Sequence, residues 1–338
     1  MRKLLLLGIG LLLSTSVYAE DLFLGAYYVS FYQEQQDQRF KDIQKIKAIG
    51  FDSIATPLGF KDMGFVEECK KNGINVIWEG NEGPREMAIK LFSAHENIKM
   101  FVVADDANYK DLETLRKDIL EFEELLPDGK ETYITVSKSA DHVTYANLAD
   151  NYAIQLYVNK EGTLRRWVWE DMVSARAITK GKLIANLQLI KNNTPNMEPY
   201  KSDPVWQAHE YPSVAYIETS MYMAMCAGAD GILFYTLYDA FIHPDKEPKF
   251  TKGNYILERW DYVRGLTDIF QRFIKYKKYF REGKRISFDE GRLVGASFIL
   301  PDGKAIKVFC DTFEYNPKVI IQEGKITTST KENLDVVI

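Results

Sequence analysis

Four acidic side chains follow apolar, β-rich runs of the sequence: Glu79, Asp105, Asp106 and Asp239. A carboxyl group whose pKa is raised by apolar surroundings can act as a general acid, and an ionised carboxylate can act as a base or a nucleophile. Asp105 and Asp106 are adjacent, so on a strand they point to opposite sides, and one of them is expected to face the site. We take all four as candidate catalytic residues; capping of a helix or pairing with a lysine is the alternative for acids at such loops.

Amide and aromatic side chains accompany these acids. Gln155 and Tyr157 alternate along one apolar run, and Asn186 and Gln188 along the next. Polar side chains inside apolar strands are costly unless they are hydrogen-bonded, so they either bind ligand hydroxyl groups or are satisfied within the core. Packing is likewise the alternative for the aromatic rings. The candidate substrate-binding residues are Tyr28, Trp78, Asn108, Gln155, Tyr157, Asn186, Gln188, Trp206, Tyr235 and Tyr238. Acids, amides and rings together suit a polyol better than a phosphate ester.

Other chemistries find less support in the sequence. Three histidines in predicted loops, His142, His209 and His243, could bind a metal ion together with Asp105 or Asp106. They lie far apart in the sequence, and exposed loop histidines explain them as well. The chain contains no Gly-x-Ser-x-Gly and no His-Glu-x-x-His motif, and its one Gly-x-Gly lies at residues 8–10. We therefore expect no metal and no cofactor.

The candidate residues must be positioned by a regular alternation of elements. Apolar β-rich runs alternate with amphipathic helical stretches about eight times between Phe23 and about Phe280. This pattern predicts a closed (β/α)8 barrel of the TIM type, whose active site lies at the carboxyl ends of the strands. The predicted strands are 22–28, 51–56, 74–78, 98–104, 132–137, 152–158, 183–189 and 231–235. The predicted helices are 35–49, 61–71, 84–95, 112–126, 142–148, 164–179, 214–227 and a last one reaching about 280.

The pattern changes after Gly283. Residues 292–300, 305–312 and 318–323 read as strands separated by turns at 301–303 and 316–317. They predict a small antiparallel β domain that packs on the barrel, because it is too small to hold a stable core alone. We therefore divide the chain into a segment 1–19, a barrel domain 20–282 and a C-terminal β domain 283–338.

Residues 1–19 have the features of a secretory signal peptide. A basic start is followed by an apolar segment and by the small-x-small site Val17-Tyr18-Ala19. The mature protein is expected in the periplasm or outside the cell and free of the membrane, with an uncleaved anchor as the alternative. The formal net charge of -5 and the lack of a basic patch argue against nucleic acid as a partner. The cysteines Cys69, Cys226 and Cys310 are expected to be buried thiols, although one disulfide is compatible with an oxidising compartment.

With these stretches the chain resembles glycoside-hydrolase-type TIM barrels. The resemblance rests on the acidic pair that ends residues 102–106, on the polar strand ends 154–157 and 186–188, and on the closing unit 211–235. It implies a catalytic barrel followed by a small C-terminal β domain and a carbohydrate substrate. The largest glycosidase clan places Asn-Glu after the fourth strand and Glu after the seventh, where this chain has Asp105-Asp106 and amides. This difference argues against the two-glutamate retaining mechanism of that clan.

Together these observations predict a secreted glycoside hydrolase acting on a polysaccharide or oligosaccharide. Asp106 or Asp105 would be the general acid, and Glu79 or Asp239 the base or nucleophile. One alternative is a barrel that binds glycans without cleaving them, in polysaccharide export or surface assembly. Another is a metal-dependent hydrolase or deacetylase that uses the loop histidines. The oligomeric state is not predicted.

Overall fold

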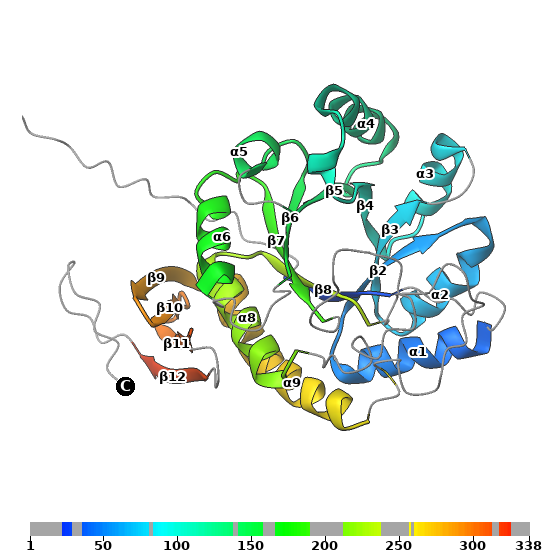
Figure 1. The fold of residues 1–338 in the computed structure, drawn as a ribbon. Helices are drawn as coiled ribbons and strands as arrows, with labels where there is room; N and C mark the ends of the chain where they lie inside the picture. Colours follow the sequence, from blue (N-terminus) through cyan, green and yellow to red (C-terminus); the bar gives the residue numbers. More distant parts are fainter. Residues whose placement is uncertain are drawn as a thin grey trace, which may run out of the picture.

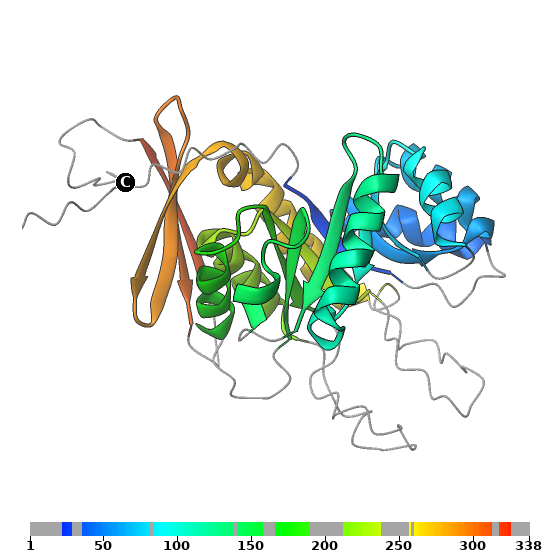
Figure 2. The same cartoon turned by 90° about the horizontal axis from the view of Figure 1, so that it is seen from above.

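A computed structural model describes residues 22–28, 36–80, 84–137, 141–157, 166–189, 212–237, 257, 260–312 and 318–325. Eight parallel strands form a closed barrel in the order β1-β2-β3-β4-β5-β6-β7-β8, surrounded by helices (Figure 1). A separate sheet of four strands lies to one side of the barrel (Figure 2). The predicted (β/α)8 barrel with a small C-terminal β domain is therefore confirmed.

Strands and helices alternate along the barrel part of the chain. The barrel strands are β1 Leu24–Tyr27, β2 Ser53–Leu58, β3 Asn75–Gly80, β4 Ile98–Ala104, β5 Glu131–Val136, β6 Asn151–Leu156, β7 Lys182–Gln188 and β8 Gly231–Tyr235. The α-helices are α1 Gln36–Ile49, α2 Met63–Lys71, α3 Arg85–Ser93, α4 Leu112–Leu125, α5 His142–Tyr145, α6 Arg166–Arg176, α8 Val214–Ala227 and α9 Trp260–Glu282. Two 3₁₀ turns are η1 Phe60–Asp62 and η2 Ala107–Tyr109.

The inside of the barrel contains one apolar layer. Each strand, or the residue next to it, contributes one side chain to this layer: Phe23, Ala55, Ile77, Met100, Tyr133, Ala153, Ile184 and Leu233. The outward-facing side chains of the same strands pack against the helices, which is why the strands are apolar on both faces. Because side chains alternate along a strand, the residue two positions beyond each member of the layer faces the carboxyl end of the barrel.

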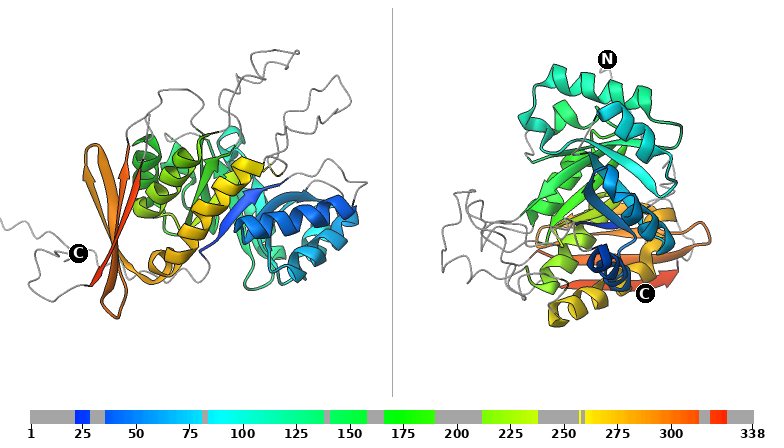
Figure 3. Two further views of the ribbon diagram at one scale, coloured as in Figure 1. Left: turned by 90° about the horizontal axis from the view of Figure 1, so that it is seen from below. Right: turned by 90° about the vertical axis from the view of Figure 1, so that its right-hand side faces the viewer.

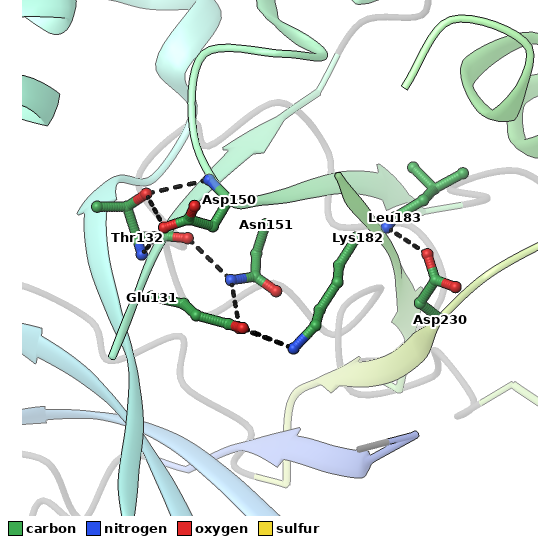
Figure 4. Close-up of polar contacts among 7 residues, drawn as sticks. All are labelled: Glu131, Thr132, Asp150, Asn151, Lys182, Leu183 and Asp230. Carbon is green, nitrogen blue, oxygen red and sulfur yellow. Dashed lines mark hydrogen bonds and ion pairs between the residues drawn. The ribbon is translucent and has the colours of Figure 1, made fainter. Parts of the chain in front are cut away.

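Polar contacts close the opposite, amino-terminal end of the barrel (Figure 4). Lys182 Nζ lies 2.8 Å from Glu131 Oε1, and Asn151 Nδ2 donates to Glu131 Oε2 at 3.1 Å. Asp150 Oδ2 accepts hydrogen bonds from the backbone N and the hydroxyl of Thr132, each at 2.9 Å. These contacts fix the starts of β5, β6 and β7 against one another.

The C-terminal sheet consists of β9 Lys284–Glu290, β10 Leu293–Ile299, β11 Lys304–Asp311 and β12 Val319–Lys325, all antiparallel. The sheet packs against α8 and is joined to the barrel by α9 (Figure 3). The sequence predicted the last three strands but missed β9. Most of β9 is exposed and its sequence is polar, so it lacks the apolar alternation that indicates a strand.

Two further expectations concern the whole described chain. Cys69, Cys226 and Cys310 are buried free thiols, as expected from the sequence. Among the described residues, none of the helices is long and apolar enough to cross a membrane.

Removal of the Asp150 carboxylate should destabilise the barrel. Asp150→Ala loses two hydrogen bonds to Thr132 and is expected to lower the free energy of unfolding by about 1 kcal/mol. Urea unfolding followed by circular dichroism measures this change. Asp128→Ala, in an exposed turn, is the matched control and should change stability by less than about 0.5 kcal/mol. Equal effects of the two substitutions would contradict the assigned contact.

Candidate active site

Asp105 enters the mouth of the barrel, the space at the carboxyl ends of the strands. The pairing of β4 with β5 shifts register between Val102 and Ala104, and such irregularities redirect side chains. Asp105 Oδ1 accepts hydrogen bonds from Thr135 Oγ1 at 2.5 Å and from Gln155 Nε2 at 3.1 Å. Both donors are inward-facing residues of neighbouring strands, so they hold the carboxylate in one orientation.

Asp106 has a different environment from its neighbour. Its backbone is left-handed, with φ 49° and ψ 47°, and its N donates to Thr135 Oγ1 at 2.8 Å. Aspartate tolerates this conformation better than most residues do. Burial raises the pKa of the Asp106 carboxyl and the charge of Asp105 raises it further, while hydrogen bonds from Ser137 and Gln155 act in the opposite direction. Among the described residues, buried Oδ1 of Asp106 has no hydrogen-bond partner.

Glu79 and Tyr27 form a pair on β3 and β1. Tyr27 Oη donates to Glu79 Oε2 at 2.5 Å. Burial raises the pKa of Glu79; the hydrogen bond from Tyr27 lowers it, and the charge of Asp105 raises it. Burial also raises the pKa of Tyr27, and Glu79 contributes to that shift. The raised pKa favours the protonated form of Glu79, and the nearby charge of Asp105 contributes to this shift.

Tyrosine rings form one wall of the mouth. The Tyr235 ring lies 5.2 Å from Tyr27 and 5.4 Å from Tyr157 between centroids, and the second pair is stacked at 27°. Tyr133 lies deeper, and both Asp105 and Glu79 raise its pKa in addition to the larger effect of burial. Among the described residues, the Tyr133 hydroxyl has no hydrogen-bond partner. It could therefore bond a ligand or a water molecule at the base of the mouth.

The amides of β6 and β7 lie side by side. Gln155 pairs in register with Asn186, and Gln188 pairs with Tyr235. Asn186 is 4% exposed, and within the described part of the chain its Oδ1 accepts no hydrogen bond. An acceptor in this position suits a sugar hydroxyl group. Asn108, in contrast, uses its Oδ1 to accept from the backbone N of Ser137 at 3.0 Å, so this oxygen orders the loop.

Two of the predicted substrate-binding residues lie elsewhere. Tyr28 is 0% exposed and donates to Asp42 Oδ2 on α1 at 2.8 Å. Trp78 is 2% exposed and packs between Phe92 and Phe101. Their placement differs from the expectation because alternate side chains on a strand face opposite ways. Tyr28 and Trp78 face the helices, whereas the preceding Tyr27 and the following Glu79 face the mouth.

Several other predicted residues fall outside the described residues: Asp239, Trp206, Tyr238, His209 and His243. His142 is described, 2% exposed, with Nδ1 2.7 Å from Tyr152 Oη. The described ranges hold no group of three or more His, Cys, Asp or Glu side chains that could bind a metal ion.

Sequence reasoning missed Tyr27, Tyr133 and Thr135 as members of this site. A signal for Tyr133 and Thr135 was present, because they alternate along β5 and therefore share one face. Choosing between Tyr27 and Tyr28 required the phase of the alternation on β1, which two adjacent tyrosines do not reveal.

Solved structures of glycoside hydrolases share this fold. A structure described as a glycoside hydrolase aligns with 92% of this chain and 90% of its own, at 10% identity and a TM-score of 0.60. A glycoside hydrolase family 5 protein from Bacteroides vulgatus aligns with 94% and 87%, at 11% identity and a TM-score of 0.59. A beta-glucuronidase from an uncultured Clostridium sp. aligns with 74% of this chain but 50% of its own, at 13% identity and a TM-score of 0.51.

No protein-family model and no curated protein matches the sequence. At identities of 10–13% the structural likeness establishes the shared barrel fold. The resemblance inferred from the sequence is thus supported at the level of architecture, while the chemistry depends on the residues at the mouth.

Glu79→Gln should change how stability depends on pH. Because the pKa of Glu79 is raised on folding, the folded protein keeps a proton that the unfolded chain releases, so stability falls as pH rises from the ordinary carboxyl pKa through the raised one. The variant lacks this loss and should gain stability over the wild type at neutral pH but not at about pH 3, below both pKa values. Urea unfolding at the two pH values measures the difference.

Glu86→Gln is the control for this experiment. The ion pair with Lys90 lowers the pKa of Glu86, so its removal should not stabilise the protein at neutral pH. If Glu79→Gln gains no stability at neutral pH relative to acid pH, folding does not raise the pKa of Glu79, and this assignment is wrong.

Proposed function

We propose that this protein is a secreted glycoside hydrolase acting on a polysaccharide or oligosaccharide. The observation that carries the proposal is the convergence of Glu79, Asp105 and Asp106 at the carboxyl end of the barrel, where TIM-barrel enzymes react. Tyrosine rings and amides beside these acids suit a sugar. The structural likeness to glycoside hydrolases supports the same reaction class. Secretion rests on the signal-peptide features of residues 1–19.

The environments of the carboxyl groups suggest a role for each. Glu79 is half-buried and its pKa is raised, which favours a role as general acid. Asp105 accepts two hydrogen bonds, from Thr135 and Gln155, which orient its carboxylate for a role as base or nucleophile. These roles are the reverse of those expected from the sequence. Asp106 remains a second candidate for the acid, because its pKa is also raised.

The reaction follows from these roles. Glu79 would donate its proton to the glycosidic oxygen while the bond to the anomeric carbon breaks. Asp105 would either attack that carbon, forming a glycosyl ester that water then hydrolyses, or take a proton from the attacking water. A separation of about 5–5.5 Å between the two carboxyl groups in the substrate complex would favour retention of configuration, and about 6.5–9.5 Å inversion. Gln155 and Asn186 would bond the sugar hydroxyl groups.

A barrel that binds glycans without cleaving them is the second candidate. The observation that favours it is the end of β7, where Asn186 and Gln188 occupy inward positions that hold no carboxylate. Amides bind hydroxyl groups but neither donate a proton to a leaving group nor attack a sugar. Polysaccharide export or surface assembly would suit such a protein.

Substitution of the two proposed catalytic residues tests the reaction. A panel of oligosaccharides and polysaccharides is first screened for release of reducing ends by the wild type. Glu79→Gln and Asp105→Asn should each lower kcat on a cleaved substrate by about 10²–10⁴-fold, the usual contribution of acid–base catalysis. The matched control is Glu131→Gln at the amino-terminal end of the barrel, which should keep kcat within about threefold if it is remote from the chemistry.

Three outcomes decide between the candidates. Full activity in both variants would contradict the assigned roles. Glycan binding by isothermal titration calorimetry without release of reducing ends across the panel would favour the non-catalytic barrel. The absence of both binding and cleavage across the panel would reject a carbohydrate function.

Secretion is tested separately. Expression of the full chain in a Gram-negative host, followed by N-terminal sequencing of the periplasmic or extracellular protein, should give a mature chain beginning at Glu20. Retention of Met1 on protein found in the cytoplasm would contradict secretion.

A further inference from the structure

An open pocket of about 390 Å³ on the outside of the barrel, called the cavity below, is lined by residues of helices α6 and α8 and strand β9. Figure 1 shows these elements on the side of the barrel that carries the C-terminal sheet. Trp169 and Arg176 line the cavity from α6, Ala227 from α8, and Arg285, Phe288 and Asp289 from β9. Its volume is within the range of small-molecule sites. The cavity lies where the C-terminal sheet meets the barrel, and none of its lining residues belongs to the mouth.

The carboxylates beside this cavity are already bound. Asp289 accepts from Arg166 through both oxygens, at 3.0 and 2.6 Å. Asp230 Oδ2 accepts from Arg176 Nη1 at 2.8 Å and from the backbone N of Leu183 at 2.9 Å (the latter contact is drawn in Figure 4). These contacts leave little negative charge for another cation in the cavity.

Among the described residues that line this cavity, Arg285 is a cation without such a partner. Over the ranges that the structure describes, its guanidinium forms no hydrogen bond and no ion pair. Burial lowers the pKa of Arg285 and the nearby charge of Arg176 lowers it further, with Asp230 acting in the opposite direction. Arginine stays protonated in proteins despite such shifts. Part of the Arg285 side chain remains exposed, so its guanidinium is available to pair with an anion in the cavity.

The backbone makes room for this guanidinium. Gly228 ends α8 with φ 116°, a conformation that favours glycine. A Cβ at Gly228 would lie 2.1 Å from Arg285 Nη1, which is far inside contact distance. The guanidinium is thus packed over the C-terminus of α8 and held beside the cavity.

We propose that this cavity binds a small molecule through an oxyanion group, a carboxylate or a phosphate or sulfate ester, with Arg285 as its main ligand. A guanidinium donates two parallel hydrogen bonds to such a group, and Trp169 and Phe288 offer apolar surface to the rest of the molecule. This site is separate from the proposed catalytic site and does not depend on the protein being a glycosidase. A ligand there would contact both α6 and β9 and would stabilise the docking of the sheet on the barrel.

Thermal unfolding of the full mature chain tests the proposal. Phosphate, sulfate, acetate and glucuronate are each compared with sodium chloride at matched ionic strength. At least one of these anions should raise the Tm above the chloride value by more in the wild type than in Arg285→Gln, because sulfate and phosphate also stabilise proteins without binding. The tetrahedral and carboxylate members of the series show which group is preferred. Isothermal titration calorimetry with that anion gives Kd, which Arg285→Gln should raise about tenfold or more, the usual worth of a charged hydrogen bond.

Two further variants keep the test decisive. Lys284→Gln, the exposed neighbour on β9, removes one positive charge without touching the cavity and should leave Kd unchanged. Arg285→Lys keeps the charge but not the paired donors, so its Kd should lie between those of the wild type and Arg285→Gln. A wild-type Tm that responds to no oxyanion beyond chloride would overturn the proposal, as would an unchanged Kd in folded Arg285→Gln.

Discussion

The apolar layer inside the closed barrel is the constraint on which the rest of this structure depends. Eight strands each place one side chain in the layer, so the direction of every other side chain on those strands is fixed by alternation. Polar groups can exist inside the barrel only above and below this layer. Below it, Glu131, Asn151 and Lys182 bond to one another, and above it the acids and tyrosines remain available for other contacts.

The same constraint explains why an irregularity in strand pairing is needed before Asp105 for its side chain to face the mouth. Regular alternation through β4 would turn its side chain with those of Phe101 and Val103, toward the helices. The register shift after Val102 changes this, and Thr135 then connects the two acids by donating to Asp105 and accepting from the N of Asp106. One hydroxyl therefore sets both the direction of one carboxylate and the left-handed turn of the next residue.

Much of this arrangement could be predicted from the sequence, and the remainder has identifiable physical reasons. Buried parallel strands are apolar throughout, which made β4 and β8 easy to recognise to the residue, but the same uniformity hides which face points inward. Trp78 was placed at the mouth for this reason, although it packs against the helices. Strand β9 escaped notice because a mostly exposed edge strand needs no apolar pattern and is stabilised by its pairing with β10.

The mouth and the outer cavity each hold ionisable groups without a described partner of opposite charge: acids in the mouth and an arginine in the cavity. Glu79 and Asp106 are half-buried and have no described cation beside them, and the exposed Arg285 lies beside carboxylates that are bound to other residues. The raised pKa values of the two carboxyl groups lower the stability of the unliganded protein as pH rises. A ligand that bonds these groups would stabilise the folded chain, because it would bind the folded protein and not the unfolded one.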